Sequence, residues 1–181
     1  TLPLTKIDAS GATGTVNVSA ASADSGVTVT PGSDALTVTL GDGADTVTGT
    51  AKADNITTGK GNDTITGMGG KDIVDAGAGD DKDTLTGGDN NVTLGTGADT
   101  LTAGDGDNTV TNTSGNTTIT LGNGVNNVTN TAGNMTLVTG SAIDTITNTA
   151  GNADITSGAG NDIITNTAGN STIDAGAGND S

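Results

Sequence analysis

Aspartate residues recur at a fixed interval in this chain, and each one closes a short glycine-rich turn. Leu94-Gly95-Thr96-Gly97-Ala98-Asp99 is one such turn, and Thr58-Gly59-Lys60-Gly61-Asn62-Asp63 is another. Glycine lets the backbone curl so that carbonyl oxygens face inward, and the aspartate adds a carboxylate. Oxygen ligands held at flexible geometry suit a hard cation that takes about six to eight of them, which is calcium rather than zinc or copper.

The turns fall into two series, and within each series the turns follow one another at intervals of 18 residues. The first series ends in Asp45, Asp63, Asp81 and Asp99, and then in Thr117, Met135, Ala153 and Ser171. The second ends in Asp54, Asp72, Asn90, Asn108, Asn126, Asp144, Asp162 and Asp180. The two series therefore carry different chemistry after residue 110.

One branched aliphatic residue per unit sets a nine-residue period, which is the signature of a repeat architecture. The only irregular steps in this reading run from Val74 to Leu85 and from Leu85 to Val92. The residues that set the phase are Val47, Ile56, Ile65, Val74, Leu85, Val92, Leu101, Val110, Ile119, Val128, Leu137, Ile146, Ile155, Ile164 and Ile173.

The elements that must position the turns are short strands. Each unit predicts a glycine-rich turn followed by a three-residue strand such as Thr64-Ile65-Thr66, with the aliphatic side chain inward and its neighbours outward. Two units make one 18-residue coil. The prediction is an all-β protein, a parallel β-roll or β-solenoid over residues 31–181, preceded by an irregular β segment over 1–30. Because the chain stops inside a unit, we expect it to be a piece of a longer protein.

The composition excludes several classes of function. The net charge of −16 argues against nucleic acid and anionic membranes as partners, and there is no apolar stretch suited to membrane insertion. The chain has no Cys, so disulfides and thiolate metal sites are excluded. Without His, Cys, Tyr, Glu or Arg, and with no serine paired to a base, no catalytic constellation is visible. We expect the protein not to be an enzyme.

The repeated unit resembles the RTX (repeats-in-toxin) calcium-binding family, whose unit reads G-G-x-G-x-D-x-U-x. The closest copies are Thr58 to Thr66 and Leu94 to Thr102. The resemblance implies a parallel β-roll in which calcium is held between turns of successive coils. It implies these carboxylate ligands: Asp45, Asp54, Asp63, Asp72, Asp81, Asp99, Asp144, Asp162 and Asp180. The glycines of the same turns are Gly41, Gly43, Gly59, Gly61, Gly77, Gly79, Gly95, Gly97, Gly158, Gly160, Gly176 and Gly178.

A simpler interpretation is that these aspartates only form turns. Turn preference does not require an aspartate every 18 residues, and two carboxylates about 5 Å apart repel by roughly 3 kcal/mol at an effective dielectric near 20. We therefore expect residues 40–100 to be unfolded without calcium. Asn90, Asn108 and Asn126 supply only a neutral oxygen, so those turns should bind calcium weakly or not at all.

The late turns of the first series have no carboxylate and read Asn-Thr-Ser/Ala-Gly-Asn, as in residues 112–116 and 130–134. Stacked in register, their asparagine amides can donate to and accept from their copies above and below. The sequence thus predicts an asparagine ladder and a metal-free edge after residue 110.

The resemblance makes this a secreted protein, most like the RTX-type proteins of bacterial surface layers (S-layers). The first expectation is a structural, calcium-dependent segment of the cell surface that self-associates in a lattice or filament, with surface polysaccharide as a possible partner through another domain. The alternatives are a stalk or ice-binding segment of a large RTX adhesin, suggested by outward threonine pairs, and the secretion or folding domain of an RTX exoenzyme.

Overall fold

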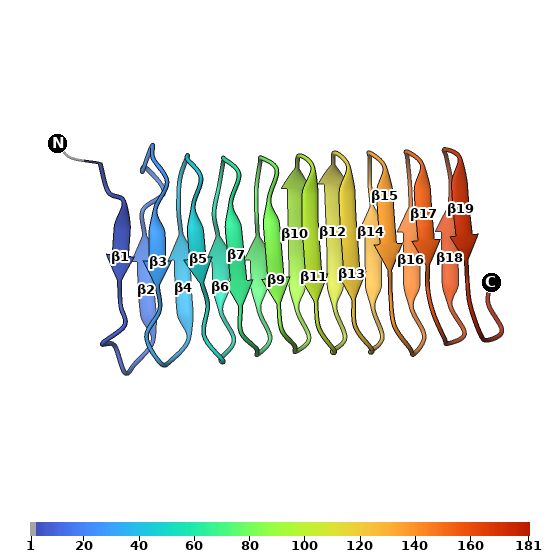
Figure 1. Ribbon diagram of the computed structural model, residues 1–181, viewed down its shortest axis with the longest axis horizontal. Coiled ribbons are helices and arrows are strands. Elements are labelled where there is room, and N and C mark those ends of the chain that lie inside the picture. The colour runs from blue at the N-terminus through green and yellow to red at the C-terminus, as the bar shows by residue number, and fades with distance from the viewer. Residues whose placement is uncertain (1–2) are drawn as a thin grey trace.

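The chain forms a flattened solenoid that rises in one direction from its N-terminal to its C-terminal end (Figure 1). The computed structural model describes residues 3–181. It has about nine turns of 18-residue coils, and residues 3–181 contain no helix, hence none that could cross a membrane. The predicted all-β parallel β-solenoid is confirmed.

Two parallel sheets form the broad faces of the solenoid, and each coil contributes one strand to each sheet. The ten-stranded sheet contains β1 (Lys6–Asp8), β3 (Thr28–Thr30), β5 (Thr46–Thr48), β7 (Thr64–Gly67), β9 (Lys82–Leu85), β11 (Asp99–Ala103), β13 (Thr117–Leu121), β15 (Met135–Val138), β17 (Ala153–Thr156) and β19 (Ser171–Asp174). The nine-stranded sheet contains β2 (Val16–Ser19), β4 (Leu36–Thr39), β6 (Asn55–Thr57), β8 (Ile73–Asp75), β10 (Asn91–Thr96), β12 (Thr109–Ser114), β14 (Asn127–Asn130), β16 (Thr145–Asn148) and β18 (Ile163–Asn166).

The register between coils is constant over most of the chain. Thr46 pairs with Thr64, and Thr109 pairs with Asn127, in each case 18 residues apart. The first coils are longer, because Lys6 pairs with Thr28 and Val16 with Leu36. A constant register places every turn above its counterpart in the preceding coil, which is what stacks the acidic turns.

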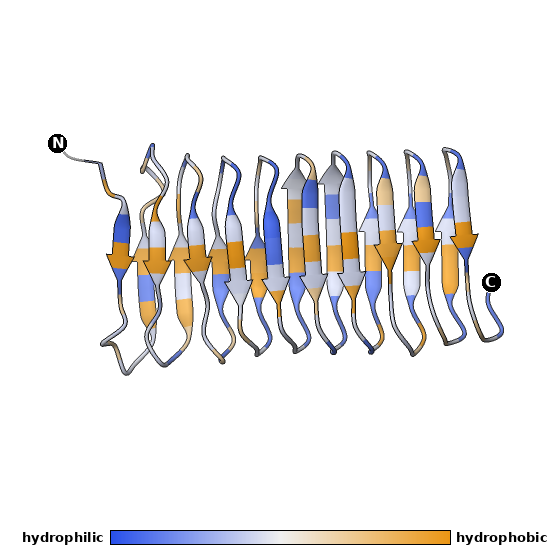
Figure 2. Ribbon diagram, viewed as in Figure 1, coloured by the Kyte–Doolittle hydropathy of each residue, from blue (hydrophilic) through white to orange (hydrophobic). Residues whose placement is uncertain are grey.

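Side chains alternate between the core and the surface along each strand, as the period-two pattern predicts. Val47, Ile65, Leu101 and Ile119 stack in one core row and are at most 1% exposed. Figure 2 shows this as apolar segments that recur in strand after strand. The neighbours of the core residues are mostly threonines, and they are exposed or partly exposed.

A further inward row lies two residues beyond the core residue of each strand, and the sequence did not reveal it. In the ten-stranded sheet it contains Gly67, Leu85, Ala103 and Leu121, which pair in register. Leu40 and Leu94 hold the same place on the other sheet, where they are 3% and 0% exposed. Glycine, alanine and leucine all occur in this row, so it carries no aliphatic periodicity.

The predicted break of the period at Leu85 is wrong. Asp83, not Leu85, pairs with Ile65 on one side and with Leu101 on the other. The nine-residue period therefore continues without interruption, and a carboxylate occupies a place in the aliphatic core row. In Figure 2, β9 is mostly blue where its neighbours carry an apolar segment.

The turns depend on glycine at one position in particular. Gly79 has φ +142°, and a Cβ there would overlap the carbonyl oxygen of Gly61 in the preceding coil. Ala142 takes the corresponding place in its own turn with φ 102°, the one positive φ of a non-glycine residue among those described. Left-handed backbone at alanine is strained, so this turn departs from the glycine pattern at an energetic cost.

Candidate metal centre

The turns lie along the two long edges of the solenoid, which Figure 1 shows as the upper and lower rows of loops. Edge A is the row leading into the ten-stranded sheet, and edge B is the row leading into the nine-stranded sheet. The residue that closes each turn points inward and stacks on its counterparts. The edge A column is Asp45, Asp63, Asp81, Asp99, Thr117, Met135, Ala153 and Ser171. The edge B column is Asp54, Asp72, Asn90, Asn108, Asn126, Asp144, Asp162 and Asp180.

The predicted aspartates are buried at these edges. Asp45, Asp63, Asp81 and Asp99 are 1–2% exposed on edge A, and Asp54, Asp72, Asp144 and Asp162 are 0–2% exposed on edge B. Asp180, in the last coil, is partly exposed. The structure thus brings the aspartates of one column together and keeps the two columns on opposite edges.

One carboxylate oxygen of each buried aspartate in the two columns has a structural role that the sequence did not reveal. The Oδ1 of Asp63 accepts a hydrogen bond from the backbone N–H of Asp45 at 2.7 Å, and the Oδ1 of Asp81 accepts one from Asp63 at 2.8 Å. On edge B the same bond recurs in every coil, from the N–H of Leu36 accepted by Asp54 to the N–H of Asp162 accepted by Asp180. The aspartates are therefore turn formers through this first oxygen.

The second carboxylate oxygen is buried and has no hydrogen-bond partner. This holds for the Oδ2 atoms of Asp45, Asp63, Asp72, Asp81, Asp99, Asp144 and Asp162. A buried carboxylate oxygen without a partner is costly, so a bound cation would compensate it. Among residues 3–181 no group of three or more carboxylates converges on one point. A cation at a turn would therefore take most of its ligands from backbone carbonyls.

The turns place backbone carbonyl oxygens close to the end of the side chain that closes the turn. In the turn of Asn108, the side-chain Nδ2 lies 2.9 Å from the carbonyl oxygen of Gly106 and 3.4 Å from that of Gly104. The glycines at the same two positions before Asp63 are Gly59 and Gly61, and those before Asp81 are Gly77 and Gly79. Carboxylate and carbonyl oxygens at a flexible turn match the ligand preference of calcium, so the residues present fit this ion.

Asp54 is an exception among the buried aspartates. Its Oδ2 accepts a 2.6 Å hydrogen bond from the backbone N–H of Thr50, and its Oδ1 accepts one from the Thr50 hydroxyl at 2.9 Å. Lys52 stands where the better turns carry their second glycine. Since Thr50 satisfies both oxygens, Asp54 is the weakest ligand candidate of the edge B column.

The electrostatics of the metal-free turns disfavour charged carboxylates. Burial raises the pKa of Asp45 and of Asp72 to about 6 and that of Asp81 to about 7, from an ordinary value of 3.8. Burial also raises the pKa of Asp63, Asp99 and Asp144. Nearby carboxylates raise the pKa of Asp45 and Asp81 further. Each turn is thus a place where either a proton or a cation stabilises the fold.

These shifts predict an inverted pH dependence for the calcium-free protein. A folded-state pKa raised above the unfolded value contributes stability that is fully present below about pH 4 and is lost as the pH rises through about 6 to 8. We expect calcium-stripped protein to melt at a higher temperature at about pH 4.5 than at about pH 8. Circular dichroism melts at both values measure this. A melting temperature that rises with pH in the absence of calcium would contradict this prediction. In saturating calcium, the melting temperature should no longer be higher at the lower pH.

Asp83 is a carboxylate near the edge A column that the sequence reading missed. It is 1% exposed, both of its oxygens lack a partner, and burial together with Asp81, Asp99 and Asp63 raises its pKa to about 8. It lies in the core row rather than in a turn. Asp83 lies nine residues after Val74, so the period itself points to it. The sequence analysis set the phase by aliphatic residues alone and therefore did not include a carboxylate.

After residue 110, edge A carries the predicted asparagine ladder. The Nδ2 of Asn112 donates to the Oδ1 of Asn130 at 2.7 Å, Asn130 donates to Asn148 at 2.6 Å, and Asn148 donates to Asn166 at 2.7 Å. The same nitrogens donate to turn carbonyls, including Gly115 at 3.1 Å and Gly133 at 2.9 Å. The predicted ladder is confirmed, and the absence of metal from this edge stays a prediction.

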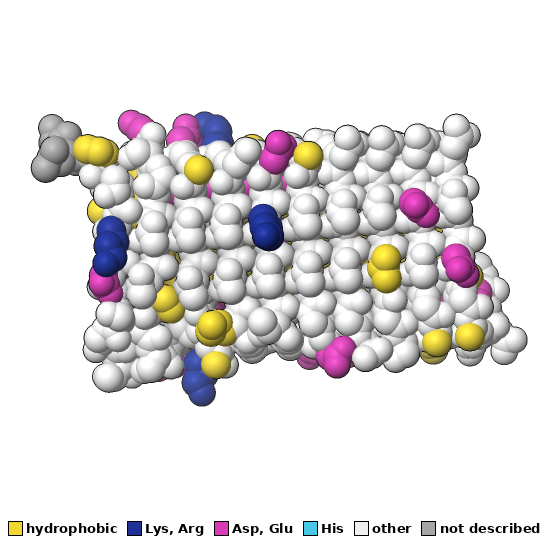
Figure 3. Space-filling model, viewed as in Figure 1, with side chains coloured by type: hydrophobic (Ala, Val, Ile, Leu, Met, Phe, Trp, Pro, Cys, Tyr) yellow, Lys and Arg dark blue, Asp and Glu magenta, His cyan; other side chains and the backbone are white. Residues whose placement is uncertain are grey.

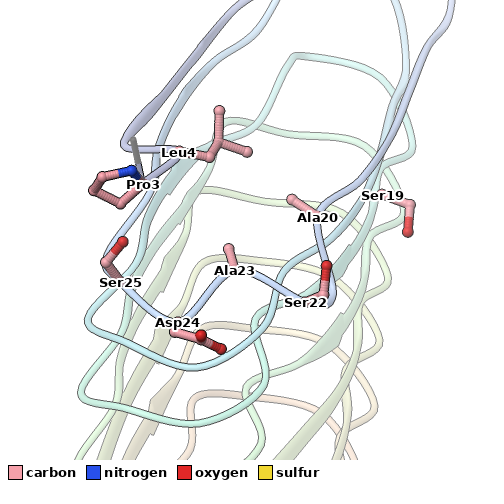
Figure 4. A pocket seen from close by; sticks show the side chains of 8 residues that line it. All are labelled: Pro3, Leu4, Ser19, Ala20, Ser22, Ala23, Asp24 and Ser25. Carbon is pink, nitrogen blue, oxygen red and sulfur yellow. The ribbon is translucent and has the colours of Figure 1, made fainter. Parts of the chain in front are cut away.

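The remaining surface offers little for chemistry. The hollow near the N-terminal end is lined by Pro3, Leu4, serine and alanine side chains, and one carboxylate, that of Asp24 (Figure 4). The face seen in Figure 3 is almost entirely uncharged, with only isolated lysines and aspartates. The acidic turns are therefore the candidate functional site.

Comparison with known families supports this site. The family model of the RTX calcium-binding nonapeptide repeat matches four times, over residues 39–70, 48–83, 84–119 and 156–181, which together exceed half of the chain. No curated protein and no solved structure matches. The matched ranges include all four edge A aspartates, whereas Asp144 and the turns of Asn130 and Asn148 lie outside them.

Proposed function

Because this chain belongs to the family of RTX calcium-binding nonapeptide repeats, we propose that it is a calcium-dependent structural segment of a bacterial surface layer. Calcium binding is implied by the repeats. Bound calcium would supply the positive charge that the second carboxylate oxygens lack. The aspartates would hold it through those oxygens, and the turn glycines through their carbonyls.

The observation that carries the structural role is the stacking of buried, unpartnered carboxylate oxygens along a continuous rod. In seven of the acidic turns the Oδ2 of the closing aspartate is buried without a partner, as in the successive turns of Asp63 and Asp81. A cation between such coils ties one coil to the next. Ion binding and folding then become one event, as in other metal-dependent small domains.

The ligand set also supports a location outside the cell. One carboxylate per turn is few for a calcium site, and low ligand charge places affinity toward the range of extracellular modules, about 10⁻⁴ to 10⁻³ M. Such sites would fill in calcium-rich surroundings and stay empty in the cytosol. A role without catalysis agrees with the residue types that the chain lacks.

Assembly in calcium tests the surface-layer role. Purified protein with about 5 mM calcium, well above the range for extracellular modules, should form two-dimensional lattices visible by negative-stain electron microscopy. Chelator should dissolve them. Monodisperse rods that fold with calcium but never associate would instead favour the stalk of an adhesin.

A second candidate rests on the outward face of the ten-stranded sheet. Threonine pairs such as Thr46/Thr48 and Thr64/Thr66 stack in register on this face. A regular hydroxyl array could order water, as in an ice-binding segment. Lys82, Val138 and Asp154 interrupt the array, which favours the structural role. A thermal-hysteresis measurement separates the two candidates.

A further inference from the structure

Three consecutive turns of edge B carry asparagine where the flanking turns carry aspartate. Asn90, Asn108 and Asn126 are 0–1% exposed. Their Oδ1 atoms accept the same inter-coil hydrogen bond as the aspartates do: Asn108 accepts from the N–H of Asn90 at 3.2 Å, and Asn126 accepts from that of Asn108 at 3.2 Å. The Oδ1 atom therefore has the same role in asparagine and aspartate. The two residue types differ in the other terminal atom, which is Nδ2 in asparagine and Oδ2 in aspartate.

That second atom is a nitrogen surrounded by oxygens. The Nδ2 of Asn126 lies 3.0 Å from the carbonyl oxygen of Gly124, 3.3 Å from that of Gly122 and 3.1 Å from the Oδ1 of Asp144. The Nδ2 of Asn108 has the equivalent three partners, the third being the Oδ1 of Asn126 at 3.1 Å. Two carbonyls of one turn and a side-chain oxygen of the next coil thus converge on a positively polarised group.

In the acidic turns the equivalent atom is the Oδ2 that lacks a partner, as in Asp72 and Asp144 on either side of the asparagines. The glycine carbonyl oxygens of the acidic turns are still present, but the aspartate side chain has no N–H group to donate to them. A cation is needed only where the side chain brings no N–H of its own, since an oxygen facing other oxygens is repelled.

We propose that the side-chain amides of Asn90, Asn108 and Asn126 take the place of calcium in their turns, so that the central coils stay folded when calcium is absent. This rests on the proposed function, in which the acidic coils need calcium. Edge A of the coils that follow Asn108 and Asn126 is closed by the ladder that begins with Asn112 and Asn130. Between residues 103 and 139 neither edge needs a cation.

The consequence is a built-in template for calcium-dependent folding. In a solenoid each coil contacts only its neighbours, so folding can begin in one coil and propagate. β12 and β14 would remain as a folded seed without calcium. The acidic coils would then add to it as calcium binds, first at Asp144 on one side and at Asp99 and Asp72 on the other.

Hydrogen exchange read by mass spectrometry on the full chain tests this segment by segment. In calcium-free buffer we expect the amides of β12 and β14 to exchange at least about 100-fold more slowly than those of β5 and β7. With saturating calcium, the two segments should become similarly protected.

A double substitution tests the role of the amides. Asn108→Asp with Asn126→Asp keeps both Oδ1 acceptors but removes the nitrogens. We expect β12 and β14 to lose their protection in calcium-free buffer and to regain it when calcium is added. The rescue by calcium is the diagnostic readout, because an ordinary packing defect would not respond to the ion. The matched control is Asn134→Asp, an exposed asparagine whose Oδ1 accepts from the N–H of Asn152 at 3.0 Å.

Three results would overturn the proposal. The first is equal exchange of the central and acidic segments without calcium. The second is full protection of the double variant in calcium-free buffer. The third is a loss of protection in the double variant that calcium does not restore. If both segments exchange fast without calcium, the calcium-dependent structural function still stands. If both exchange slowly, that function fails as well.

Discussion

Replacing Asp83 by valine is expected to stabilise the calcium-bound solenoid by about 2–4 kcal/mol. The reason is the environment of Asp83, which lies in register between Ile65 and Leu101 with no partner for either oxygen. Valine removes a buried polar group without hydrogen bonds and fills the same row with apolar volume. Chemical denaturation in saturating calcium, followed by circular dichroism, measures the change in free energy of unfolding.

Two further variants isolate the cause. Asp83→Asn removes the charge but keeps an unpartnered polar group, so it should recover only part of the gain. Asp154→Val makes the same exchange at an exposed position of β17 and should change stability by less than about 0.5 kcal/mol. A fall in calcium affinity of Asp83→Val would contradict this account, because it would make the Asp83 carboxylate a ligand.

Replacing Asp63, Asp81 and Asp99 together by asparagine is expected to abolish calcium binding at these three edge A turns and to remove their need for calcium in folding. Each asparagine would keep the Oδ1 acceptor that the preceding coil requires. Its nitrogen could donate to the turn carbonyls, as that of Asn108 does to Gly106. In the central coils, replacing asparagine by aspartate is expected to create a requirement for calcium. Replacing aspartate by asparagine at edge A should therefore remove one.

The matching triple alanine variant separates the two roles of the aspartates. Alanine lacks both the acceptor and the donor, so residues 41–102 should stay unfolded with or without calcium. Circular dichroism and calorimetric calcium titration compare the two triple variants with the unchanged chain. If the asparagine variant needs as much calcium to fold as the unchanged chain, the amide does not substitute for the ion at edge A.

The overall fold could be predicted because its determinants are local and repeated. A single nine-residue unit specifies a turn, a strand and an inward aliphatic residue, and 18-residue pairing then specifies two parallel sheets. Leu85 misled the prediction, because a leucine two residues beyond the core position also points inward. Periodicity of residue type cannot show two neighbouring inward rows when one of them contains glycine, alanine and leucine.

The candidate site could be predicted only in part. The spacing of Asp45 to Asp99 indicated stacked carboxylates, and the structure places them in one buried column. The sequence could not show that one oxygen of each carboxylate is already used by the preceding coil, because this depends on turn geometry. It also could not show that Thr50 satisfies Asp54, or that the amide of Asn108 reaches the glycine carbonyls.

The coil-by-coil stacking also determines how the rod would respond to a pulling force. Neighbouring coils are joined by parallel strand pairing, such as Val92 with Val110, and by side-chain bonds between turns. Tension applied at the two ends would peel off one coil at a time rather than stretch the whole rod. Each coil that detaches would release about 60 Å of chain in exchange for about 4.8 Å of stacked length. An ion at each acidic turn would then set the force of each step, so the calcium concentration would tune the extensibility of the segment.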